Sequence, residues 1–64
     1  MSNLRDIRKL RGLSQAQLAA RAGVSTSRIS VQERKGIHDI RTAKKLGVIL
    51  NCNPLFLLDE LNKI

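Results

Sequence analysis

The side chains with the most distinctive chemistry lie in segment 25–35, whose sequence is STSRISVQERK. If this segment is a helix with Ile29 facing the core, each residue advances by about 100°, and the outer face is short, polar and cationic. That face and its flanks carry Ser27, Arg28, Ser30, Val31, Arg34 and Lys35, without an acid. Short side chains let a helix approach the floor of a DNA groove, where hydroxyl and guanidinium groups bond base edges or phosphates and valine suits a thymine methyl. The alternative is a solvated helix that is cationic by chance.

Two short helices joined by a sharp turn are predicted to position this face. Ser14 and Gln17 form a capping box, in which each side chain bonds the other residue's backbone N–H and starts a helix. Gly23 can take a positive φ and end that helix, and Val24 is predicted to fill the corner. Ser25 is a good N-cap for the next helix, so the arrangement is a helix-turn-helix.

The remaining chain is predicted to form three more helices and no strand. The first helix spans Leu4–Arg11 and ends before Gly12. The fourth is capped by Asp39 and ends at Leu50. The fifth is capped by Asn53 and has Pro54 at its first position. Helical spacing predicts an inward stripe of Leu4, Ile7, Arg8, Leu10, Ile40, Ala43, Leu46, Gly47, Leu50, Leu57, Leu58 and Leu61. The fold class is therefore all-α, with five helices in a single domain over residues 1–64.

Composition narrows the classes of function. The 64 residues carry 12 Lys and Arg against 5 Asp and Glu, a net charge of +7, and residues 1–45 hold eleven of the bases and three of the acids. This uneven distribution of positive charge favours a polyanionic partner such as nucleic acid. The other interpretation is that the charge serves only to keep the protein soluble. One His and one Cys provide no disulfide, metal spacing or nucleophile–base pair, so we expect no enzyme activity and no cofactor. Cys52 is predicted to be a buried small hydrophobe.

Between residues 13 and 33 the chain resembles the phage Cro and lambda-repressor-like (XRE-type) helix-turn-helix family. The motif L-S-Q-x-x-L-A-x-x-A-G-V-S is present as Leu13, Ser14, Gln15, Leu18, Ala19, Ala22, Gly23, Val24 and Ser25, and it continues with Ile29 and Glu33. A second match, LNCNPLFLL at 50–58, is similar to the family's entry into the fifth helix. The resemblance covers about residues 3–61 and implies a compact five-helix fold that binds double-stranded DNA.

The resemblance also implies roles for individual residues. Base reading falls to Thr26, Ser27 and Val31, and phosphate binding to Gln15, Ser25 and Arg34. The helical geometry of the segment adds Arg28 to the base-reading residues and Lys35 to the phosphate-binding ones. Arg8 and Glu33 match a partly buried ion pair of some relatives. The loop 37–41 departs from the family, because Asp39 and Ile40 replace more basic residues and a proline.

The resemblance further implies a cytoplasmic regulator of a bacterial host that binds a palindromic operator as a weak homodimer reinforced on DNA. Pro54, Leu55 and Phe56 match the family's dimer contact; exposure is expected for Leu55, whereas Phe56 is predicted either to be exposed or to enter the core. A Cro-like repressor is the leading interpretation. The alternatives are an antitoxin or restriction–modification controller on the same fold, or a protein-interaction module. No membrane segment and no small-molecule ligand are expected.

Overall fold

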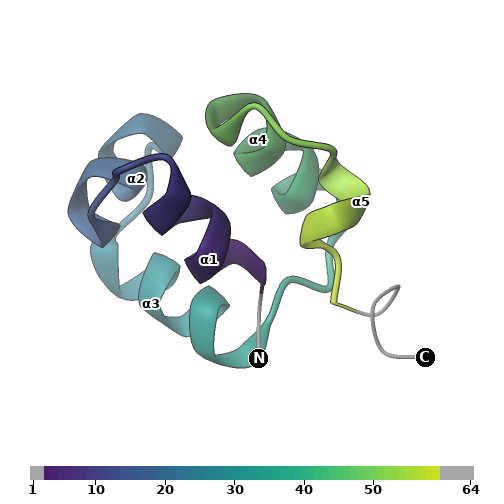
Figure 1. Ribbon diagram of the computed structural model, residues 1–64. Coiled ribbons are helices and arrows are strands. Elements are labelled where there is room, and N and C mark those ends of the chain that lie inside the picture. Colours follow the sequence, from purple (N-terminus) through teal and green to yellow (C-terminus); the bar gives the residue numbers. More distant parts are fainter. Residues whose placement is uncertain (1–2, 60–64) are drawn as a thin grey trace.

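The computed structural model describes residues 3–59. Their fold consists of five helices, shown in Figure 1: α1 (Asn3–Leu10), α2 (Gln15–Ala22), α3 (Thr26–Lys35), α4 (Ile40–Leu50) and α5 (Pro54–Leu57). The all-α class and the order of the helices agree with the sequence analysis. The first helix begins and ends one residue earlier than predicted, since Arg11 already belongs to the turn that ends at Gly12.

The helix-turn-helix is held by the predicted local bonds. Ser14 Oγ accepts from the N–H of Gln17 at 3.0 Å, and the N–H of Ser14 donates to the Gln17 side chain at 2.8 Å. Gly23 has a φ of 70°, which lets the N–H of Val24 reach back to the carbonyl of Ala19 at 3.0 Å. Ser25 Oγ then accepts from the N–H of Arg28 and caps α3. The angle between α2 and α3 is therefore encoded locally.

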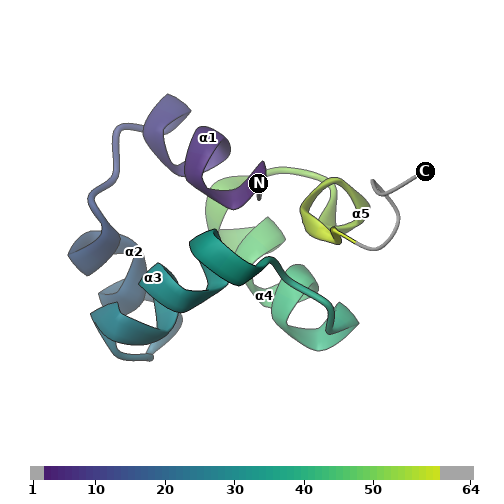
Figure 2. The same cartoon turned by 90° about the horizontal axis from the view of Figure 1, so that it is seen from below.

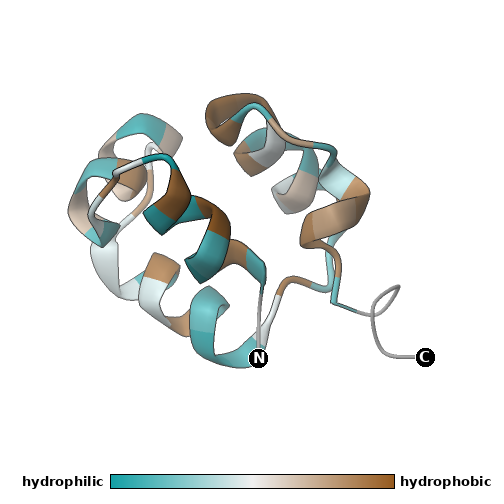
Figure 3. Cartoon of the chain, in the orientation of Figure 1, coloured by the Kyte–Doolittle hydropathy of each residue, from teal (hydrophilic) through white to brown (hydrophobic). Residues whose placement is uncertain are grey.

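The core lies between α1, α2 and α3 on one side and α4 and α5 on the other, and it is aliphatic. Its largest fully buried side chains are Leu4, Leu18, Ile29, Ile37, Leu46, Leu50 and Leu57. Figure 2 shows α3 with α1 on one side and α4 on the other, so its two flanks have different neighbours. Figure 3 shows α5 and the end of α4 as largely hydrophobic, whereas α1 and α3 alternate hydrophobic with hydrophilic segments.

Two residues predicted to face the core do not. Ile40 is 42% exposed, because it is the first residue of α4 and lies about 60° around the helix from the buried Ala43. Leu10 is 71% exposed at the last position of α1, where no neighbouring element covers it. The inward stripes of both helices are therefore shorter than the periodicity predicts.

The fifth helix also differs from the prediction, since it has a single turn. Leu58 is buried as expected, but its backbone is extended and forms an isolated parallel bridge with Ile37. Asp59 extends this contact: its N–H donates to the Ile37 carbonyl at 3.0 Å, and its Oδ2 accepts from the Ile37 N–H at 2.5 Å. These bonds tie the chain after α5 to the α3–α4 loop. Leu61 lies outside the described residues.

Candidate nucleic-acid interface

The outer face of α3 has the composition that the sequence predicts. Ile29 is fully buried, whereas Ser27 and Val31 lie on the opposite side and are exposed, Val31 by 39%. The other residues predicted to contact DNA from this helix, Thr26, Arg28, Arg34 and Lys35, are also exposed. The structure thus places a hydroxyl and a methyl-bearing side chain on the outer face of α3, with exposed cations on its flanks and at its end.

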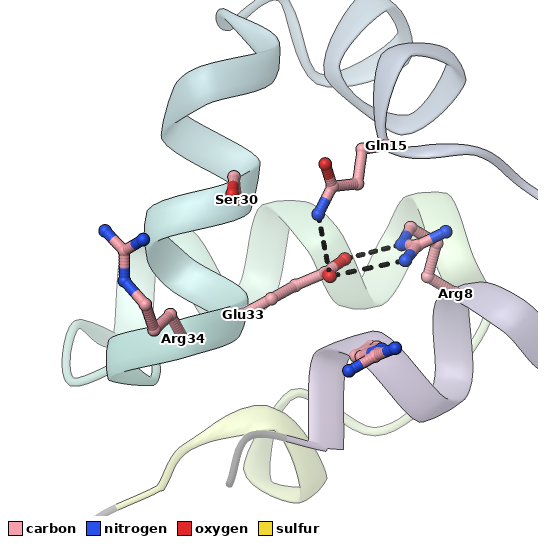
Figure 4. Close-up of a pocket in the computed structure, with 6 residues that line it drawn as sticks. Arg8, Gln15, Ser30, Glu33 and Arg34 are labelled. Atoms are coloured by element: carbon pink, nitrogen blue, oxygen red, sulfur yellow. Dashed lines mark hydrogen bonds and ion pairs between the residues drawn. The ribbon is translucent and has the colours of Figure 1, made fainter.

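The single acid of α3 is turned inward and paired. Arg8 Nε of α1 donates to Glu33 Oε2 at 2.5 Å, and Arg8 Nη2 lies 3.3 Å from Glu33 Oε1. Gln15 Nε2, at the start of α2, donates to the same Oε1 at 3.0 Å, as Figure 4 shows. Arg8 Nη1 donates in addition to the Leu13 carbonyl at 2.7 Å. One carboxylate therefore joins α1, α2 and α3, and it leaves the outer face of α3 without a negative charge.

Glu33 is nearly removed from solvent. The Arg8 and Glu33 side chains are only 10% and 6% exposed. Burial raises the pKa of Glu33, but the hydrogen bonds from Arg8 and Gln15 and the charge of Arg8 outweigh it, so the pKa lies below its ordinary value. The carboxylate consequently stays ionised in the folded protein near neutral pH.

A polar hollow lies beside this network, between α1 and α3. It has a volume of about 430 Å³ and is lined by Arg5, Arg8, Gln15, Ser30, Glu33 and Arg34. Within residues 3–59 the guanidinium groups of Arg5 and Arg34 have no hydrogen-bond or ion-pair partner. Two unpaired cations from different helices make this hollow suited to an anion. Ser30 was placed on a flank of this face from the sequence, whereas Arg5 joins it without having been singled out.

The helix starts offer further donors beside this face. Gln15 uses one N–H of its amide for Glu33, so its second N–H remains available. Ser25 uses its oxygen to accept from Arg28 N–H, which leaves its O–H free to donate. A phosphate at either helix start would also meet the positive end of the helix dipole. Gln15 is therefore both a brace for α3 and a candidate phosphate contact.

Three of the four acids of residues 3–59 are engaged in bonds that hold the fold. Asp39 caps α4, where its Oδ2 accepts from the N–H and the hydroxyl of Thr42 at 3.0 and 2.9 Å. These bonds lower the pKa of Asp39. Asp59 is bonded to Ile37, and Glu33 to Arg8. Asp6 is the one remaining acid in this part of the chain, and it lies on the exposed side of α1.

The residues predicted to form a dimer contact lie on α5, apart from α3. Leu55 is 52% exposed, Phe56 is 46% exposed, and Pro54 is half-buried. Phe56 is therefore outside the core, which decides between the two placements left open by the sequence. Cys52 is half-buried against the core, and this burial raises the pKa of its thiol, in keeping with a packing role.

Residues 3–59 contain no group of three or more His, Cys, Asp or Glu side chains placed to hold a metal ion. No helix in the same range has the length and apolar character needed to cross a membrane.

The fold and this face define a helix-turn-helix DNA-binding protein. A family model described as helix-turn-helix matches residues 4–57, and the chain belongs to that family, the lambda-repressor- and Cro-like proteins. It is thus a DNA-binding regulator whose partner is double-stranded DNA, in a family of regulatory domains and not of enzymes. Neither the comparison with curated proteins nor that with solved structures found a match.

Proposed function

We propose that the protein is a Cro-like phage or prophage repressor that binds a two-fold symmetric operator as a homodimer, with α3 in the major groove, in the cytoplasm of a bacterial host. The observation that carries this proposal is the exposed, acid-free outer face of α3, whose only carboxylate is held inward by Arg8 and Gln15. A groove lined by phosphates repels carboxylates, so a surface of hydroxyls, valine and cations is the composition it accepts.

The length and position of each side chain decide whether it can contact base edges or phosphates. Ser27 and Val31 stand on the outer side of the first turns of α3, and Thr26 is exposed at its first position, where side chains meet base edges. Arg34 and Lys35 end the helix and are long enough to reach phosphates. Gln15 and Ser25 carry phosphate-binding donors at the two helix starts. Arg28 lies at the side of the reading face, within reach of a base edge or of the backbone.

The dimer would form through α5. Leu55 and Phe56 are neighbouring exposed apolar side chains, and Pro54 adds a rigid edge. Three residues make a small patch, so we expect a weak dimer in free solution that forms fully on DNA, where two half-sites about 34 Å apart hold the copies together. Replacing Leu55 with Glu should abolish dimer formation and weaken operator binding while the monomer keeps its helical content.

The test is binding to duplex DNA in a salt series with competitor DNA present. The wild type should bind with affinity that falls steeply as salt rises, and Ser27→Ala or Val31→Ala should change which sequences are preferred. Val48→Ala, which truncates an 82% exposed valine on α4, is the matched control and should change neither. If Val31→Ala and Ser27→Ala leave the preference of the wild type intact, the proposed reading face is wrong.

A further inference from the structure

A second hollow lies on the other flank of α3, between α3 and α4. It has a volume of about 130 Å³, room for roughly four water molecules at about 30 Å³ each, which is the scale of a phosphate group. It is lined by Ala22, Val24, Arg28, Gln32, Thr42, Lys45 and Leu46. No acid lines it among the described residues. The α1-side hollow described above and this one therefore border α3 from opposite sides.

The helical geometry of α3 gives the same division independently. With Ile29 at zero and about 100° per residue, Ser30 and Arg34 lie on one flank, at about +100° and +140°. Arg28 and Gln32 lie on the other flank, at about −100° and −60°. Ser27 and Val31 stand between the flanks, on the outer face.

The chemistry of the α3–α4 hollow is that of an anion site. The Arg28 guanidinium and the Lys45 ammonium come from different helices, are exposed, and have no hydrogen-bond or ion-pair partner within residues 3–59. Ala22, Val24 and Leu46 supply an apolar wall, beside which the attraction between an anion and these two cations is stronger than in open water. The amide of the half-buried Gln32 adds a donor.

The dimensions of DNA identify the anion. The major groove is about 12 Å wide, and a helix with its side chains is about 10–12 Å across, so a helix in the groove has a phosphate backbone along each flank. We propose that Arg28 and Lys45 hold a phosphate of the strand opposite to the one met by Arg5 and Arg34. This assignment rests on the proposed placement of α3 in the groove. It makes Arg28 a backbone contact, in place of the base contact predicted from the sequence, and gives Lys45 a part in DNA binding.

The neighbouring lysine of α4 offers a matched control. Lys44 is also exposed but does not line the hollow, so Lys44→Gln and Lys45→Gln remove the same charge from adjacent positions. With a duplex selected from random-sequence DNA, Lys45→Gln should weaken binding about tenfold for each bound copy, as expected for a charged hydrogen bond, and Lys44→Gln should have only a small effect. The double variant Arg28→Gln/Lys45→Gln should lose less than the product of the two single losses, because both groups hold one phosphate. The magnitude of its salt slope should fall by about 0.9 for each bound copy.

Three results would overturn the assignment. The first is an equal loss of DNA affinity in the Lys44 and Lys45 variants. The second is a relaxed base preference at one position of the DNA site in Arg28→Gln. The third is full competition of inorganic phosphate with DNA at constant ionic strength, which would indicate a site for the free ion. Thermal melts of each variant check that the fold is kept. If the wild type binds no duplex, the proposed function itself fails, whereas salt-sensitive binding by the wild type with an inert Lys45→Gln refutes the α3–α4 phosphate site alone.

Discussion

Removing Arg8 should destabilise the protein more than removing Arg8 and Glu33 together. Arg8→Met deletes the guanidinium that gives Glu33 its bonds at 2.5 and 3.3 Å, and it leaves the carboxylate with the single amide donor of Gln15. The Glu33 side chain is 6% exposed, and water from the polar hollow beside it can replace the lost donors only in part. The variant thus buries an uncompensated charge.

The magnitude follows from that burial. Breaking a buried ion pair from one side costs about 3–5 kcal/mol, and the remaining Gln15 bond places the expected loss near the lower end. Domains have about 0.05–0.15 kcal/mol of stability per residue, or about 3–10 kcal/mol for a chain of this length. Arg8→Met should therefore lose much of its free energy of unfolding. Arg8→Met/Glu33→Leu replaces the pair with apolar side chains and should regain about 2 kcal/mol or more.

Urea denaturation followed by circular dichroism at neutral pH measures this difference directly. The midpoints should run in the order wild type, double variant, Arg8→Met, with similar slopes, since the surface exposed on unfolding is nearly the same. A single variant as stable as the double variant, or more so, would refute the reasoning, because Glu33 would then tolerate the loss of its partner.

Four further predictions follow from the same contacts. The pKa of Glu33 is lowered in the folded protein, so its contribution to stability is present above the unfolded-state pKa and is lost as the pH falls through the folded-state pKa. In Glu33→Gln, the free energy of unfolding should therefore decrease less steeply as the pH is lowered. Ser14→Ala removes half of the capping box and should cost about 1 kcal/mol by urea denaturation, whereas Ala16→Ser, at an exposed position, should cost less. Gly36→Ala should lower the melting temperature more than Gly23→Ala. Both glycines have a positive φ, but a methyl group at Gly36 meets the Asp59 carboxylate, whereas one at Gly23 points into open space. Equal melting temperatures would contradict this. Leu55→Glu should remove any dimer seen by sedimentation without lowering the melting temperature, since Leu55 is 52% exposed, and a large drop in melting temperature would show that α5 needs this residue for folding.

Local signals predicted most of this fold, because they act over a few residues. The Ser14–Gln17 box and the Asp39 and Asn53 caps depend on side-chain hydrogen bonds within three residues, and the Gly23 turn depends on a positive φ that glycine adopts readily. Each of these features is present. Where the prediction was wrong, long-range packing decided the result. Ile40 satisfies helical spacing, but no neighbour covers it. The helical pattern of Leu57 and Leu58 ends early because Leu58 pairs with Ile37, twenty-one residues away.

In the candidate site, too, local patterns in the sequence were predictive and long-range neighbours were not. Helical periodicity along α3 located the exposed face with Ser27 and Val31, and the family resemblance indicated that Arg8 and Glu33 would meet. Neither signal could place Arg5 beside Arg34, or Lys45 beside Arg28, because those neighbours depend on how α1 and α4 pack against α3. Exposed cations have no pattern in the sequence that distinguishes a binding position from a solvated one.

Selection of bound sites from random duplex DNA tests the central claim most directly, because it reports the specificity of α3 and the symmetry of the complex together. The account predicts a two-fold symmetric consensus with half-sites about 34 Å apart, and loss of preference within each half-site for Ser27→Ala and Val31→Ala. Recovery of no consensus by the wild type, or of a consensus that these two variants reproduce unchanged, would contradict it.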